Sequence, residues 1–373
     1  MKYMGSKRKM LNGMLGEIID DKIKNANRFV DLFCGSGSVA WYVAKKYDKK
    51  VISVDLQKYS KIISQSILSR IEPINVEKYW SLWNKKYQGN LKKTKLLKIA
   101  KNAFNEDISI WSKNSKSVCE KYDGGIIWKS YGGYYYSAEQ ALKLDILMNS
   151  IPFNSVKEKV AITSIIFAAS QCSGSPGHTA QPFKANKTAG KFLKEYWLKD
   201  PLYFAEKYFK EIGLEYSKVK GKSYTSDALN FKHIEDGDLI FLDPPYTGVQ
   251  YSRFYHVLET IARKKVGKVF GTGRYSPIEE RPDSVFSKRK TSKGQFEKLI
   301  KKLSEKDTTL IITYPDRECS NGLNGRDVIK ISKKYFKKSK KKLVSTNFST
   351  LGGNNVKRDS RLLTNEMILI LNN

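Results

Sequence analysis

The feature that most restricts the fold is a strand, turn, helix and strand within the first sixty residues. The apolar run RFVDLFCG at 28–35, with a single acid, predicts a strand that ends at glycines. SGSVAWYVAKKY at 36–47 predicts a helix with one buried face, and KVISVDL at 50–56 predicts a second strand. Elements in this order form a β-α-β unit, in which the two strands run parallel.

Four later apolar stretches fit further strands. They are KSYTSDALNF at 222–231, DLIFLDPPY at 238–246, TTLIITY at 308–314 and NEMILILNN at 365–373. Strands that alternate with helices are typical of a parallel sheet with helices on both faces. We therefore expect an α/β fold with a doubly wound, mostly parallel sheet.

A long region between the second and third predicted strands interrupts this pattern. Residues 58–122 are Lys-rich and helical in pattern, and we interpret the whole of 58–222 as a largely helical inserted subdomain and candidate specificity module. The core would then comprise residues 1–57 and 223–373. VKEKVAITSIIFAAS at 156–170 is apolar nearly all round, so we expect it to be a buried helix of that main core.

The charge balance indicates a polyanionic partner. The chain has 68 Lys and Arg against 37 Asp and Glu, a formal charge of +31 and a pI near 9.7. A genome-wide preference for lysine would explain part of this excess, but such a preference usually brings glutamate with it. A positive field of this size holds phosphate backbones, so we expect nucleic acid as a partner before a membrane.

Cysteine and histidine spacing excludes several other classes of protein. The four cysteines lie far apart without a CxxC spacing, and the three histidines do not cluster with them. Neither a metal site nor a disulfide framework is predicted. The first residues lack the apolar run of a signal peptide, and no stretch reaches the ~18 apolar residues of a membrane span. We expect a cytoplasmic protein that does not bind a membrane.

Glycines and acids surround the first predicted turn. Gly35 and Gly37 let the backbone approach a ligand, although a dinucleotide fingerprint would have a third glycine where Ala40 stands. Asp31, at the strand end, would repel a pyrophosphate but attract the ammonium of a methionine moiety. Asp55, at the second strand end, can accept hydrogen bonds from both ribose hydroxyls. These acids favour S-adenosylmethionine over an ordinary structural turn.

Three motifs together resemble a known family. YMGSK at 3–7, D-x-F-x-G-x-G at 31–37 and DPPY at 243–246 are similar, in content and order, to the motifs of the Dam-like D12 class of N6-adenine DNA methyltransferases. The resemblance spans nearly the whole chain. It implies the S-adenosylmethionine-dependent methyltransferase fold, with residues 58–222 as a target-recognition region. It also implies methylation of N6 of a flipped-out adenine in double-stranded DNA, in a restriction-modification or phage-defence setting where a cognate restriction endonuclease can be a partner.

The resemblance assigns the chemistry to DPPY. The exocyclic amino group of adenine is a poor nucleophile because its lone pair is delocalised into the ring. Asp243, through its carboxylate, and Pro244, through its carbonyl, can accept the two N–H bonds and favour a tetrahedral nitrogen. Pro244 and Pro245 fix φ and remove N–H donors, so the turn presents acceptors. Tyr246 would stack on the flipped base, and the methyl group would move by direct displacement from the sulfonium.

The family pattern implies further contacts to the cofactor. Tyr3 and Lys7 match an N-terminal motif beside the methionine end, although Tyr3 stands where close relatives have Trp. Phe33 belongs to the glycine-turn motif. Asp227, in TSDALNF, occupies the place of an acid that binds the adenine amino group of the cofactor.

Two stretches after DPPY are candidates for DNA contact. Residues 247–265 begin with a flexible segment and lead into a helix that carries Arg253 and Arg263. Residues 268–290 form a long, basic loop with Gly and Pro, and we expect this loop to contact phosphates. The Lys-rich run at 333–343 predicts a solvated surface hairpin.

Alternative functions remain within and outside this chemistry. N4-cytosine methylation usually has SPPY, so Asp243 favours adenine, and methylation of protein glutamine usually has Asn at this position. RNA stays open as a substrate. A DNA-binding protein that kept the fold and lost catalysis is the alternative from another class, but such a protein has no need for Asp31, Asp55 and DPPY together.

Overall fold

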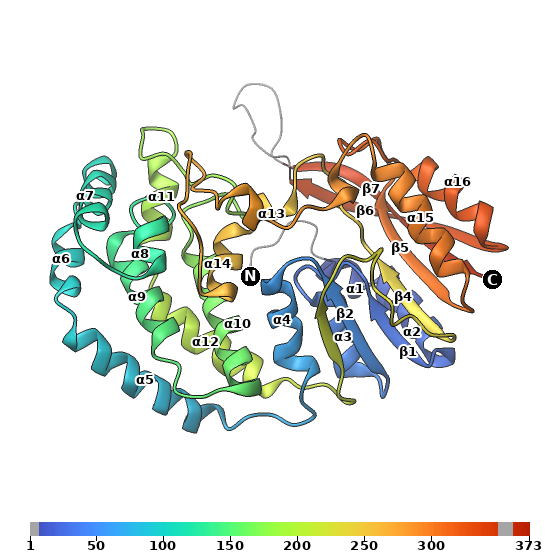
Figure 1. The fold of residues 1–373 in the computed structure, drawn as a ribbon, viewed down its shortest axis with the longest axis horizontal. Helices are drawn as coiled ribbons and strands as arrows, with labels where there is room; N and C mark the ends of the chain where they lie inside the picture. Colours follow the sequence, from blue (N-terminus) through green and yellow to red (C-terminus); the bar gives the residue numbers. More distant parts are fainter. Residues whose placement is uncertain (1–6, 350–360) are drawn as a thin grey trace. The chain divides into compact units, whose positions relative to one another are not determined.

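The computed structural model describes residues 7–349 and 361–373, which divide into two compact units (Figure 1). The sheet unit holds the described residues up to Ser64, then Ser217–Tyr251, and the described residues from Asp283 onward. The helical unit holds Gln65–Tyr216 and Ser252–Pro282. The helical unit therefore draws on two separate stretches of the sequence.

Seven strands form one sheet in the order β3-β2-β1-β4-β5-β7-β6. Their bounds are β1 Arg28–Asp31, β2 Lys50–Asp55, β3 Lys222–Thr225, β4 Asp238–Leu242, β5 Thr309–Pro315, β6 Lys338–Ser349 and β7 Arg361–Asn372. The first five strands pair in parallel, whereas β7 runs antiparallel to both β5 and β6. The expected mixed α/β fold with a mostly parallel sheet is confirmed.

Helices cover both faces of this sheet, as the apolar pattern of its strands requires. The five residues of β4 are all buried, which is typical of a central parallel strand. Val30, Ile52 and Ile240 lie on one face and pack with Phe296 of α15 (Ser292–Ser304) in one apolar cluster. α16 (Gly325–Tyr335) contributes to the same cluster, while α3 (Ser38–Lys46) contacts β1 and β2. The remaining short helices of this unit are α1 Arg8–Leu11, α2 Met14–Lys22, η1 Ile23–Asn25 and η3 Val285–Ser287.

The helical unit is built on long helices with aromatic contacts between them. Its helices, with α4 and α13 at its borders, are α4 Lys58–Leu68, α5 Val76–Lys93, α6 Leu96–Asn102, α7 Ile108–Lys121, α8 Ile126–Tyr131, α9 Ala138–Asn149, α10 Ser155–Cys172, α11 Gly190–Trp197, α12 Pro201–Leu214, α13 Tyr251–Phe254, α14 His256–Arg263 and η2 Ile278–Glu280. Trp83 and Phe209 meet edge to face at 5.5 Å between ring centroids. Ser137 caps α9 in a capping box with Gln140.

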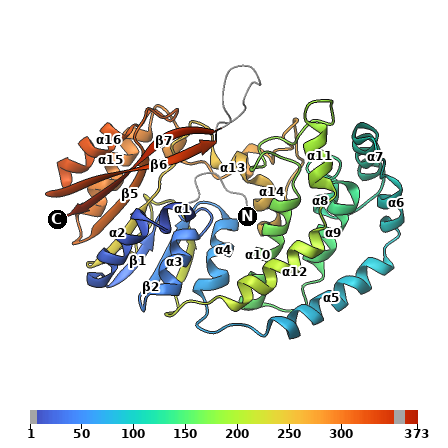
Figure 2. The same cartoon turned by 180° about the vertical axis from the view of Figure 1, so that it is seen from behind.

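Three expectations about individual elements need correction. The helix predicted at 156–170 is α10, which lies in the helical unit against α12, α14 and α9, and not in the sheet unit where we expected it (Figure 2). The Lys-rich run at 333–343 is not a hairpin, because it contains the end of α16 and the start of the edge strand β6. The strand predicted at 28–35 ends earlier, at Asp31, where the glycine turn begins. None of the described helices combines the length and apolar character needed to cross a membrane.

Candidate active site

Three carboxylates come together at the carboxyl edge of the parallel sheet. Asp31 ends β1, Asp55 ends β2, and Asp243 directly follows β4. Because β1 pairs in parallel with both β2 and β4, these strand ends meet at one edge. Asp31 is 1% exposed, and the side chain of Asp243 is 18% exposed. Open α/β sheets bind their ligands at this edge.

The glycine turn is held against the end of β2. Gly35 and Gly37 both have positive φ, 52° and 75°, so a side chain at either position would be strained. The backbone N–H of Gly35 donates to Asp55 Oδ2 at 2.8 Å, and the N–H of Gln57 donates to Asp55 Oδ1 at 2.9 Å. These two hydrogen bonds fix the orientation of the Asp55 carboxylate beside the glycine turn.

A buried lysine joins the acid of DPPY to the last strand. Lys7 Nζ lies 2.9 Å from Asp243 Oδ2 and 2.8 Å from Glu366 Oε1. Thr313, in β5, donates its hydroxyl to Asp243 Oδ1 at 2.9 Å. Both carboxylate oxygens of Asp243 are therefore engaged in this state, and one ammonium is shared between two carboxylates.

The charges of this cluster shift the pKa values of its members. Burial is the main cause that raises the pKa of Asp31 to about 8, and the charges of Asp243 and Asp55 add to it. Burial also raises the pKa of Asp243, against the opposing charge of Lys7. For Lys7, burial would lower the pKa, but the charges of Asp243 and Glu366 overcome it and raise the pKa. The edge is crowded with carboxyl groups, and a positively charged ligand would stabilise their ionised forms.

The remainder of DPPY presents one unused acceptor. Asn321 Nδ2 donates to the carbonyl of Pro245 at 2.7 Å and so fixes the turn. Among the described residues, none donates a hydrogen bond to the carbonyl of Pro244. Tyr246 is 8% exposed, and its ring meets that of Tyr251 edge to face at 6.5 Å between centroids. The carbonyl of Pro244, next to Asp243 in the chain, therefore accepts no hydrogen bond from the described residues.

Two of the remaining expected cofactor residues lie near the same edge. Phe33 is half-buried and contacts Phe286 edge to face at 5.2 Å. Asp227 lies two residues beyond the end of β3, and its carboxylate accepts the N–H of Leu229 at 2.8 Å. The preceding residue, Ser226, donates its N–H to the carbonyl of Asp55 at 2.9 Å. Tyr3 lies outside the described residues.

Sequence reasoning missed three residues of this site. Glu366 and Thr313 contact the cluster directly, and Asn321 holds the DPPY turn. The pattern of NEMILILNN at 365–373 predicts a buried strand, and nothing in it indicates that its single acid, Glu366, belongs to a site. Its position at the carboxyl edge depends on β7 running antiparallel to β5, where Glu366 pairs with Pro315.

No group of three or more His, Cys, Asp or Glu residues placed to hold a metal ion occurs among residues 7–349 and 361–373. The four cysteines are buried and free.

Comparison with known proteins places these motifs in a family. The chain is 26% identical over 329 residues to the "Modification methylase LlaI" of Lactococcus lactis subsp. lactis, which covers 85% of this chain and 46% of that protein. It is 27% identical over 305 residues to the "Type II methyltransferase M.FokI" of Planomicrobium okeanokoites, covering 81% of this chain and 43% of that protein. It is 26% identical over 281 residues to the "Type II methyltransferase M.NlaIII" of Neisseria lactamica, covering 70% of this chain and 69% of that protein.

The chain spans less than half the length of the first two relatives. The family model that describes D12 class N6 adenine-specific DNA methyltransferases matches residues 3–312, which include the glycine turn and DPPY. The chain therefore belongs to the D12 class of N6 adenine-specific DNA methyltransferases.

Proposed function

We propose that this chain transfers a methyl group from S-adenosylmethionine to the N6 amino group of adenine in double-stranded DNA. The observation that carries the proposal is the acceptor pair of the DPPY turn, Asp243 and the unused carbonyl of Pro244, at the sheet edge that also holds Asp31 and Asp55. A carboxylate and a carbonyl can accept both N–H bonds of an exocyclic amino group. Family membership and relatives named as modification methylases support the same activity.

The cofactor residues fit a ligand with two positive charges. A buried carboxylate such as Asp31, whose pKa is about 8, gains most from a cation that replaces its proton. We propose that Asp31 takes the ammonium of S-adenosylmethionine and Asp55 its ribose. Gly35 and Gly37 give the close backbone approach, and Tyr3, Lys7, Phe33 and Asp227 complete the pocket.

In the proposed reaction the protein positions the amino group and stabilises it. Bound S-adenosylmethionine supplies the electrophilic methyl carbon. Asp243 and Pro244 hold the nitrogen so that its lone pair faces that carbon, while Pro245 keeps the turn rigid and Tyr246 stacks on the flipped base. Asp243 is also the carboxylate placed to receive the proton that the methylated nitrogen loses.

Lys7 must leave one oxygen of Asp243 when the amino group arrives. An unpaired ammonium in a buried position would be costly, but Glu366 still neutralises Lys7 after this exchange. We therefore assign Glu366 as the residue that positions Lys7. Since Glu366 lies beyond residue 312, the family match does not include it.

Target recognition is proposed for the helical unit. Most of its residues come from the region 58–222 that we interpreted as the recognition insertion, and the remainder from the stretch after DPPY. The relatives' names also favour a restriction-modification setting, in which a cognate endonuclease cleaves the unmethylated sequence.

The test is to identify the methylated base. The purified protein is incubated with S-adenosylmethionine carrying a labelled methyl group and with double-stranded DNA, and the DNA is then digested to nucleosides. We expect the label in N6-methyl-2′-deoxyadenosine. Label in N4-methyl-2′-deoxycytidine would show that the target base is cytosine and not adenine, and absence of label from DNA of varied sequence would overturn the proposal.

A further inference from the structure

Two arginines of the helical unit are fixed on the same aromatic ring. The guanidinium carbon of Arg253 lies 4.6 Å from the ring centroid of Tyr275, and that of Arg281 lies 5.3 Å from it. Arg281 also lies 5.1 Å from the ring of Phe270. A guanidinium stacked on a ring is held in place while its N–H groups stay available for an anion.

The ring itself is rigidly mounted. Phe270 and Tyr275 exchange both of their backbone hydrogen bonds, at 3.0 and 2.9 Å, and so close a tight hairpin. Tyr275 donates its hydroxyl to the carbonyl of Ala180 at 2.6 Å, which ties the hairpin to another part of the helical unit. Arg253 and Arg281 therefore have a preformed support, which reduces the entropy cost of binding.

Two other arginines of the helical unit form ion pairs or hydrogen bonds within the protein. Arg263 pairs with Glu259 at 2.6 Å and donates to the carbonyl of Glu280 at 2.7 Å. Arg274 donates to the carbonyls of Ser130 and Lys129. Arg281 likewise donates its Nε to the carbonyl of Ser276 at 2.8 Å, but in the described part of the chain no carboxylate forms an ion pair with Arg253 or Arg281.

The two unpaired cations create a local surplus of positive charge. Burial, and then the charge of Arg253, lowers the pKa of Arg281. Nη2 of Arg281 is buried and has no hydrogen-bond partner in the described structure. An anion that bridges the two guanidinium groups would supply the missing acceptor and offset their repulsion.

The surroundings of Arg281 are polar and also incompletely bonded. A cavity of about 10 Å³ is lined in part by Ser252, His256 and Arg281, and each of these residues has one buried polar atom without a partner. Burial is the main cause that lowers the pKa of His256 to about 4, so His256 is neutral at pH 7. The cavity has room for a single water or one oxygen atom, so a larger anion would lie mainly at the exposed side chain of Arg253.

We propose that Arg253 and Arg281, stacked on Tyr275, bind a phosphodiester group of the DNA backbone. The identity of the anion rests on the proposed function, since a DNA methyltransferase meets phosphodiesters along its whole substrate. Two guanidinium groups with free N–H donors match the two non-bridging oxygens of such a group. The formal charge of +31 gives the chain the field that attracts this partner.

The test measures DNA binding separately from methyl transfer. Arg253→Gln and Arg281→Gln are compared with wild type by fluorescence anisotropy on duplexes, over a series of salt concentrations. Each variant should bind DNA roughly 3- to 30-fold more weakly, and the slope of log affinity against log salt should fall by about 1. Arg253→Lys keeps its charge and should keep the slope.

Lys334→Gln is the control, because this exposed lysine belongs to the sheet unit, lies outside the candidate DNA-contact stretches and already pairs with Glu297. It should leave the salt slope unchanged. Unchanged slopes in both Arg253→Gln and Arg281→Gln, with unfolding temperatures like wild type, would overturn the proposal. So would a loss of affinity confined to duplexes that contain the methylation sequence, because that result indicates contact with a base edge.

Failure of the phosphate site can be told apart from failure of the proposed function. A reduced slope in a protein that methylates no DNA would support the phosphate site and reject the enzymatic proposal. Normal methyl transfer by the wild type, with unchanged salt slopes in the variants, would support the enzymatic proposal and reject the phosphate site. Because Arg253 is exposed, its glutamine variant should fold even where Arg281→Gln does not.

Discussion

At the scale of single residues, the site depends on how one buried ammonium is divided between two carboxylates. Lys7 contacts Asp243 at 2.9 Å and Glu366 at 2.8 Å, and Asp243 also accepts a hydrogen bond from Thr313. Tyr246, Asp31 and Tyr314 also feel the charge of Asp243. The acceptor strength of Asp243 is therefore set by partners from four different segments of the chain.

Replacing Glu366 with Gln should slow the chemical step. Lys7 would then have Asp243 as its one remaining carboxylate in the cluster and would hold it more tightly, so kcat at saturating cofactor and DNA should fall by about tenfold, about 1.4 kcal/mol of barrier. The charge of Glu366 raises the pKa of Asp243, so its removal lowers that pKa. The reaction needs ionised Asp243, and the acid limb of the kcat profile should therefore move to lower pH.

A control separates this effect from a general loss of surface charge. Glu297→Gln removes an exposed acid of the sheet unit that pairs with Lys334, and neither kcat nor the acid limb should change. Equal profiles for Glu366→Gln and wild type, with both proteins folded, would contradict the role assigned to Glu366.

At the scale of elements, the sequence predicted the strands that are buried on both faces. It missed the features whose position depends on which strands pair. β4 and β5 could be predicted because central parallel strands are continuous apolar runs. Asp31 and Asp55 were predicted as site residues from their places at strand ends, and Asp243 from the resemblance of DPPY to the family motif. All three lie at one edge of the sheet. β6 could not be predicted, because its Lys-rich start is polar on both faces.

The positions of Glu366 and α10 could not be predicted from the sequence either. Glu366 reaches the site only because β7 runs antiparallel to β5, and a strand's direction leaves no mark in its own composition. The apolar pattern of α10 correctly indicated a buried helix, but it did not indicate which of the two units buries it.

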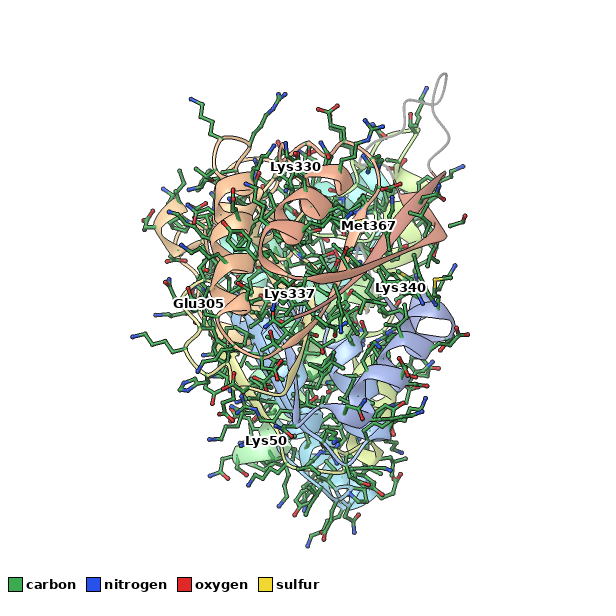
Figure 3. The ribbon with its side chains drawn as sticks, turned by 90° about the vertical axis from the view of Figure 1, so that its right-hand side faces the viewer. Lys50, Glu305, Lys330, Lys337, Lys340 and Met367 are labelled. Carbon is green, nitrogen blue, oxygen red and sulfur yellow. The ribbon has the colours of Figure 1, made fainter. Side chains whose placement is uncertain are left out.

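The lysines of β6 protect an open sheet edge. β6 is the last strand of the described sheet, and Lys338, Lys340 and Lys342 are alternate residues of it, so they share one of its faces. Figure 3 labels Lys340. Charged side chains on an edge strand oppose pairing with a second copy. We predict that changing these three lysines to Gln raises self-association, measured by sedimentation velocity.

A second triple variant controls for the loss of three charges. Lys330, Lys333 and Lys334 lie on α16 of the same unit, and their change to Gln should leave the protein in its original association state. Equal association of the two variants would show that net charge, and not the strand edge, sets the behaviour.

At the scale of the whole molecule, the excess of 31 positive charges and the carboxyl groups at the sheet edge favour ligands of opposite charge. The overall field attracts a polyanion, while Asp31, Asp55 and Asp243 form a local site that suits cations and amino groups. This contrast fits an enzyme that holds DNA by its phosphates and treats one base at an anionic edge. A protein that only bound DNA would have no use for buried carboxylates at that edge.

The most direct measurement is methyl transfer by Asp243→Asn. The amide keeps the size of the carboxylate but loses its charge and one acceptor, so transfer to double-stranded DNA should fall by about 10² to 10³. Affinities for S-adenosylmethionine and DNA should stay within a few-fold of wild type. Asp316→Asn, an acid that follows β5 as Asp243 follows β4 and pairs with Lys341, should keep full activity. Transfer by Asp243→Asn at the wild-type rate would contradict the account.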